Sequence, residues 1–144
     1  MGNDDTIKLL KECDAGSKMA VASIDDMLDR VQDSNLKELM RESREHHEKL
    51  GNDLHSLLLE FGSDEKEPNV MAKSMSKLKT SMKLSMDECD ATIADLMTDG
   101  CNMGVKSLNK YLNKYKGADE VSKDTTKRLI NLEEKLAVDI REFL

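Results

Sequence analysis

Two adjacent histidines stand beside glutamates in the segment REHHEKLGNDLHSLLLEF, which covers residues 44–61. Proteins use imidazole and carboxylate groups to bind iron and zinc, and they also pair the two groups structurally inside a core. Apolar residues recur in this segment at spacings of three and four, which predicts a helix. Because a helix turns by about 100° per residue, His47 falls inside the apolar stripe and His46 at its edge, while Glu45 and Glu48 point to solvent.

An internal repeat supplies a polar residue opposite His47. Residues 16–28, GSKMAVASIDDML, align with residues 100–112, GCNMGVKSLNKYL, at a shift of 84. Residues 47–58, HEKLGNDLHSLL, align with residues 133–144, EEKLAVDIREFL, at a shift of 86. Glu133 is therefore the equivalent of His47 and has the same inward angle on its own helix. We expect the two side chains to face each other as a hydrogen-bonded pair, since an unpaired buried charge is costly.

The same repeat predicts the architecture. Each half reads as two helices with a short polar turn, and Asp33 or Ser34 is the expected N-cap of the second helix. Helices of about 26 residues are about 40 Å long, so a long, partly helical crossover is expected to return the chain along the bundle. We predict one all-α domain over residues 1–144, a four-helix bundle of two repeated helical hairpins. The predicted helices cover residues 5–31, 34–61, 85–116 and 120–144.

Small residues occupy equivalent positions in the two halves. We expect them to let helix backbones approach closely, with a cavity for a small ligand as the alternative interpretation. These residues are Gly16, Ser17 and Ala20 in the first half and Gly100, Cys101 and Gly104 in the second.

The composition narrows the classes of function. The chain has 22 basic and 29 acidic residues, and the net charge of −7 argues against nucleic acid as a partner. No apolar run approaches the length of about 18 residues that a transmembrane helix requires. Three cysteines without a CxxC spacing favour a reducing, cytoplasmic setting.

The hairpin repeat, with its DAGSKM and TDGCNMG segments, resembles the ferritin-like superfamily, and in particular uncharacterised bacterial members that carry a domain of unknown function. The resemblance covers nearly the whole chain. It implies a ferritin-like bundle, and in metal-binding relatives it implies di-iron chemistry such as iron oxidation, oxygen activation or peroxide reduction. Such sites take a Glu from each of two helices and a Glu-x-x-His motif from each of the other two.

This chain departs from that ligand pattern. The inward positions of the first and third predicted helices hold no carboxylate, and Ser43 and Arg44 stand where a Glu-x-x-His motif needs its glutamate. The last helix has no histidine. We therefore expect a bundle without a complete di-iron site and without a cofactor, in a structural or interaction role rather than as an enzyme. The inward residues are Cys13, Ser17, Ala20, Ile24 and Met27, and then Met97, Cys101, Gly104, Leu108 and Tyr111.

Other interpretations stay open. His46, His47 and Glu133, with Cys13 or Cys101, could bind a single iron or zinc ion. Residues 69–86 combine four lysines with a methionine stripe, so this basic helix either packs its methionines on the bundle or docks to a membrane or an acidic partner. A homodimer is expected, because two-fold pairs are the commonest assemblies.

Overall fold

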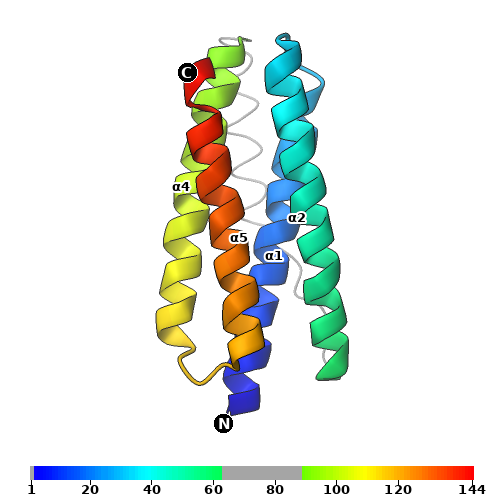
Figure 1. Cartoon of the computed structure of the whole chain (residues 1–144), viewed down its shortest axis with the longest axis vertical. Helices are drawn as coiled ribbons and strands as arrows, with labels where there is room; N and C mark the ends of the chain where they lie inside the picture. The colour runs from blue at the N-terminus through cyan, green and yellow to red at the C-terminus, as the bar shows by residue number, and fades with distance from the viewer. Residues whose placement is uncertain (1, 63–88) are drawn as a thin grey trace.

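The structure is a computed structural model that describes residues 2–62 and 89–144. These residues form four α-helices and a terminal 3-10 turn without any strand, which confirms the all-α prediction. The helices lie side by side, with α1 antiparallel to α2 and α4 antiparallel to α5 (Figure 1). They span Gly2–Leu28 (α1), Ser34–Glu60 (α2), Asp90–Lys114 (α4) and Glu120–Asp139 (α5), and the 3-10 turn η1 spans Arg141–Phe143.

Two expectations concern residues 63–88 and lie outside the described part of the chain. These are the partly helical crossover and the basic helix over residues 69–86. Among the helices that the structure describes, none is long and apolar enough to cross a membrane.

The helix ends follow local capping rules. Asp33 caps α2 as predicted, and its Oδ1 accepts the backbone N–H groups of Asn35 and Leu36 at 2.7 and 3.2 Å. Gly62 follows α2 with φ +67°, a left-handed conformation that glycine adopts without strain. The expected start of the third helix at Ser85 is wrong. Cys89 is extended, with φ −127° and ψ 160°, so α4 begins only at Asp90.

The C-terminal ends of α1 and α5 also differ from the prediction. Helix α1 stops at Leu28 rather than at residue 31, and α5 stops at Asp139 rather than at Leu144. In both places the backbone continues with i→i−3 hydrogen bonds, such as Arg30 N–H to the Met27 carbonyl and Phe143 N–H to the Ile140 carbonyl. A tighter final turn of this kind is a common helix ending that side-chain periodicity does not reveal.

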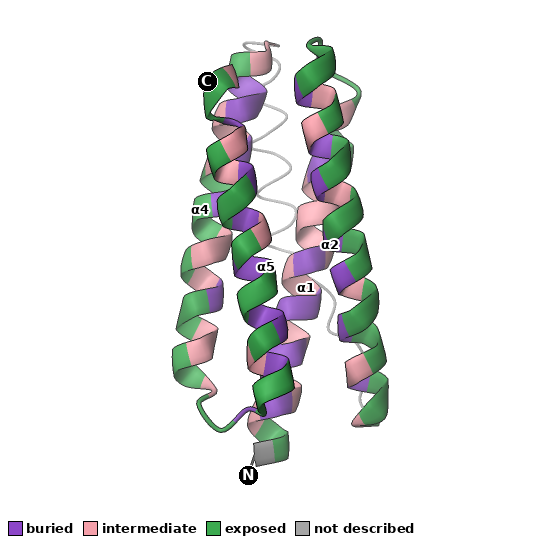
Figure 2. Cartoon of the chain, in the orientation of Figure 1, coloured by how far each residue is buried: buried purple, intermediate pink, exposed green. Residues whose placement is uncertain are grey.

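The buried faces of the helices form two apolar clusters, and the buried residues line the inner sides of the helices in Figure 2. Between the two clusters, near mid-length, lie the buried polar side chains of Ser17, Ser43, His47 and Glu133, which we call the polar layer. The first cluster contains Ile24, Met27, Val31, Leu36, Met40, Ile93, Ala94, Met97, Cys101, Leu136 and Ile140. The second contains Leu9, Leu10, Cys13, Leu50, Leu54, Leu58, Leu108, Ala118, Leu129 and Ile130.

Hydrogen bonds at both ends of the bundle repeat the internal symmetry of the sequence. At one end, Asp33 N–H donates to Asp90 Oδ2 at 2.8 Å. At the other end, Asp119 N–H donates to Thr6 Oγ1 at 2.9 Å. Asp33 and Asp119 differ by the repeat shift of 86, and Thr6 and Asp90 by the shift of 84. The N-terminus of the first helix in each half therefore holds the turn of the other half.

The prediction about small residues is partly wrong. A Cβ atom placed on Gly16 or Gly100 would meet nothing within 4 Å, so neither glycine is needed for close packing. The tight approach occurs instead at Gly51, where a Cβ atom would lie 3.2 Å from Ser17 Oγ. At Gly104 a Cβ atom would lie 3.4 Å from the carboxyl carbon of Glu133, so this glycine leaves room for an acidic side chain in the core.

Candidate functional site

His47 of α2 and Glu133 of α5 meet in the polar layer, as the repeat predicts. His47 Nε2 lies 3.2 Å from Glu133 Oε1. The imidazole residue is 0% exposed and the glutamate 8% exposed. Both residues stand on the buried stripe of their helix, so the apolar neighbours that bury the helices also hold the pair in place.

The backbone decides which nitrogen of His47 carries a proton. Nδ1 lies 2.7 Å from the carbonyl oxygen of Ser43, one turn earlier in α2. A carbonyl can only accept, so Nδ1 carries hydrogen and donates it. The Nε2–Oε1 contact then requires one further proton, because a bare nitrogen lone pair facing a carboxylate would be repelled. His47 Nε2 and Glu133 Oε1 therefore share one proton, without which the two acceptors would repel each other.

The charge state of His47 follows from competing effects. Burial lowers the pKa of His47, whereas the hydrogen bond with Glu133, the charge of that carboxylate and the Ser43 carbonyl raise it. The net direction is a raised pKa, which favours an imidazolium beside the carboxylate.

Two cysteines border the layer, and both are kept as thiols. Burial raises the pKa of Cys101, and the charge of Glu133 and a hydrogen bond to it raise that pKa further. Burial likewise raises the pKa of Cys13 to about 12, and its Sγ lies 3.2 Å from Thr126 Oγ1. A thiolate is the form that binds metal, so neither cysteine is prepared as a ligand at neutral pH.

The structure separates the third predicted ligand from the pair. His46 is exposed on the outer face of α2, as are Glu45 and Glu48. Glu48 accepts a hydrogen bond from Arg44 Nη1 at 2.9 Å on that outer face. Within residues 2–62 and 89–144, no group of three or more His, Cys, Asp or Glu side chains is arranged to hold a metal ion.

Sequence reasoning missed two features of the layer. The carbonyl of Ser43 gives no signal in side-chain patterns, although its position four residues before His47 allows this contact in any helix. Asp14 is 1% exposed and forms an ion pair with Lys18 at 3.2 Å. The spacing of four between Asp14 and Lys18 predicts that ion pair, but it does not predict the burial of the acid.

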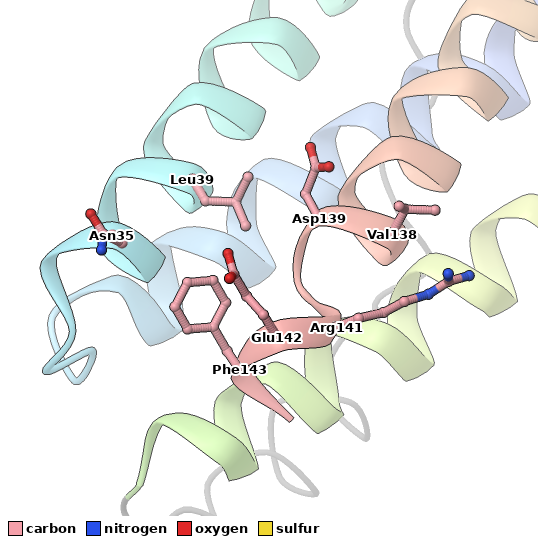
Figure 3. A pocket seen from close by; sticks show the side chains of 7 residues that line it. All are labelled: Asn35, Leu39, Val138, Asp139, Arg141, Glu142 and Phe143. Carbon is pink, nitrogen blue, oxygen red and sulfur yellow. The ribbon is translucent and has the colours of Figure 1, made fainter.

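Two hollows lie at the surface of the described residues. A groove of about 380 Å³ between α1 and α2 has His47, Ser17 and Gly51 among the residues that line it. The other hollow, of about 480 Å³, is formed by the start of α2, the end of α5 and η1 (Figure 3). Its lining contains none of the predicted site residues and consists of Asn35, Leu39, Val138, Asp139, Arg141, Glu142 and Phe143.

Removing one member of the pair should destabilise the fold. His47→Leu leaves Glu133 buried without its partner and should lower the free energy of unfolding by about 1–3 kcal/mol in chemical denaturation. The exposed-site control Glu45→Ala should have no measurable effect. His47→Leu combined with Glu133→Leu should recover much of the lost stability, because the double variant leaves no buried polar group without a hydrogen-bond partner. A double variant as unstable as the sum of the two singles would contradict a direct contact.

The raised pKa of His47 predicts a direction for the pH dependence. Its contribution to stability should be fully present below the unfolded pKa of about 6.5 and should disappear as the pH rises through the higher folded-state pKa. The difference in unfolding free energy between the parent protein and His47→Gln should therefore shrink on the alkaline side. His46→Gln, at the exposed neighbouring histidine, is the matched control for the loss of an imidazole. A difference for His47→Gln that grows with pH would contradict the assignment.

Comparison with known proteins adds a family and a fold. No curated protein matches the chain. The crystal structure of a DUF305 fragment from Deinococcus radiodurans matches 96% of this chain and 93% of that chain, with a TM-score of 0.75 and 12% sequence identity. At that identity the likeness concerns the fold alone. A family match over residues 5–114 covers most of the sequence, and the chain belongs to the family described as Domain of unknown function (DUF2383).

Proposed function

We propose that this protein is a ferritin-like four-helix bundle without a complete di-iron site, which acts by associating with another protein surface rather than by catalysis. The observation that carries the proposal is the content of the polar layer. One imidazole and one carboxylate satisfy each other there. Ser17 of α1 lines a groove with His47, and Cys101 and Gly104 of α4 approach Glu133.

The ferritin-like topology is supported by the pairing of the helices. Helix α1 packs mainly against α2, and α4 packs mainly against α5. The hydrogen bonds of Asp33 and Asp119 occupy repeat-equivalent places at opposite ends. Two similar antiparallel pairs packed on each other are what a hairpin repeat of this kind would build.

The donor set does not fit a di-iron centre. Two iron ions need several carboxylates to offset their charge, as in bundles where four helices each contribute an acid. In the described residues Glu133 faces His47, and the other buried acid near the layer, Asp14 of α1, forms an ion pair with Lys18. The His47 Nδ1 atom is occupied by the Ser43 carbonyl, so this imidazole offers a single nitrogen.

Binding of one iron or zinc ion is the second candidate function. It is favoured by one observation, the hydrogen bond between the Cys101 thiol and Glu133, although in the described residues these groups are not arranged as a metal site and would have to move to form one. His47, Glu133 and Cys101 would hold the ion, and binding would require the thiol to lose its proton. The free cysteines Cys13, Cys89 and Cys101 support a reducing, cytoplasmic setting for either function.

Metal analysis separates these candidates. Protein purified from iron-rich medium should contain far fewer than two iron atoms per chain and should show no oxo-bridged absorption band. Added iron or zinc should shift the thermal unfolding midpoint of the parent protein no more than that of the His47→Leu, Glu133→Leu double variant. Two iron atoms per chain would overturn the proposal. Stabilisation by zinc of the parent protein alone would favour the single-metal function.

We further propose that the protein associates with a second copy of itself. Large apolar side chains remain exposed on several helices, and a two-fold dimer is the simplest assembly that covers such residues. Light scattering at micromolar concentration should give twice the chain mass of 16.2 kDa. A monomer mass under these conditions would contradict it. The exposed residues are Leu59, Met103, Val121, Val138 and Leu144.

A further inference from the structure

Two residues that the sequence repeat makes equivalent touch each other in the core. His47 and Glu133 are related by the shift of 86, and their side chains are 3.2 Å apart. Equivalent residues can meet only near the axis that relates the two halves. The repeat-equivalent hydrogen bonds of Asp33 and Asp119 lie away from that axis, at opposite ends of the bundle. The His47–Glu133 pair therefore marks the approximate two-fold axis of the chain.

The buried faces of the two helix pairs share many apolar positions, and residues of one apolar cluster have repeat equivalents in the other. The faces differ at Leu36 and Met40, whose equivalents on α5 are the buried Ser122 and Thr126. At the shared positions, burial of apolar surface gives little reason to prefer one docking partner over another. An α1–α2 pair would find a similar apolar face on an α4–α5 pair or on the α1–α2 pair of a second copy. The buried equivalents include Leu9 and Ile93, Cys13 and Met97, Ile24 and Leu108, Leu50 and Leu136, and Leu54 and Ile140.

The polar layer removes this ambiguity. If two α1–α2 pairs docked on each other, two His47 rings would meet, each with Nδ1–H already donated to Ser43. To form a hydrogen bond, one ring would have to be charged and the other neutral, which leaves a buried positive charge with no carboxylate to balance it. If two α4–α5 pairs docked, two Glu133 carboxyl groups would meet in the same buried place, and sharing one proton would leave an unbalanced negative charge. Only the unlike combination gives a hydrogen bond in which the two charges balance each other.

We propose that His47 and Glu133 act as specificity-determining residues that direct an α1–α2 pair onto an α4–α5 pair and exclude like-with-like docking between two copies of this chain. A buried polar residue fixes partner choice in coiled coils by the same principle, because the wrong combination leaves a polar group unmet. The inference goes beyond the proposed function, since it assigns how the chain selects its own internal partner whatever the outer surface binds.

The proposal predicts the behaviour of exchanged residues. His47→Glu places two carboxylates in the layer, and Glu133→His places two imidazoles there. Each single variant should unfold roughly 5 °C or more below the parent protein. The double variant His47→Glu, Glu133→His restores one of each and should regain most of that shift. The exposed neighbours provide the matched controls, and His46→Glu and Glu134→His should leave the unfolding temperature unchanged.

Mixing the two single variants provides the decisive measurement. Each chain alone has like residues in its layer, but an exchange of helix pairs between the two chains would give both layers one imidazole and one carboxylate. Full-length His47→Glu and isotopically labelled Glu133→His are unfolded together, refolded, and examined by native mass spectrometry and thermal unfolding. We expect a one-to-one complex that unfolds at a higher temperature than either variant refolded alone.

Two results would overturn the inference. One is a mixture that unfolds at the temperatures of its separate components, and the other is a double variant no more stable than the singles. Parent protein refolded with labelled parent protein controls for association through the outer surface. Dimers of that kind leave every layer unchanged and also form when each variant is refolded alone. They therefore cannot make the mixture unfold at a higher temperature than its separate components.

Discussion

The contact between His47 and Glu133 is the interaction on which the middle of the bundle depends. It is the one place where the described chain puts an imidazole and a carboxylate together in its core, and it lies between two apolar clusters that could each tolerate some sliding or repacking. Apolar contacts tolerate such changes at small cost in stability. A buried polar group does not tolerate them, because losing its partner leaves it without a hydrogen bond in a region of low dielectric. The pair therefore imposes a single alignment on helices that apolar burial alone would hold loosely.

The surrounding residues serve that contact in different ways. The Ser43 carbonyl fixes the imidazole tautomer from within α2, and the absence of a side chain at Gly104 admits the Glu133 carboxyl group from across the core. Cys101 presents a protonated thiol to the same carboxylate. Each of these partners comes from a different helix from that of the glutamate, so the layer connects α2, α4 and α5. Within that layer, a proton shared by His47 and Glu133 joins α2 to α5.

Much of this arrangement could be predicted from the sequence. Apolar spacing gave the four helices, the capping preference of Asp33 gave the start of α2, and the shift of 86 gave the pairing of His47 with Glu133. Side-chain patterns failed where the backbone decides the outcome. The extended conformation of Cys89, the hydrogen bond to the Ser43 carbonyl and the contact of Gly51 with Ser17 depend on local dihedral angles and on helix spacing. Gly16 and Gly100 were predicted to be contact positions because they are small and equivalent, and neither property guarantees a neighbour.

The hydrogen bonds at the two ends of the bundle limit one particular motion. Asp90 accepts the N–H groups of Gln32 and Asp33, both at 2.8 Å, while Asp5 and Thr6 accept those of Gly117 and Asp119 at the opposite end. A helix advances by about 5.4 Å per turn, so a slip of one turn along the long axis would carry every one of these donors out of range of its acceptor. Slip in either direction meets the same resistance, because acceptors at both ends belong to the half opposite their donors. Axial shear, the easiest rearrangement for smooth parallel cylinders, is thus opposed at both ends.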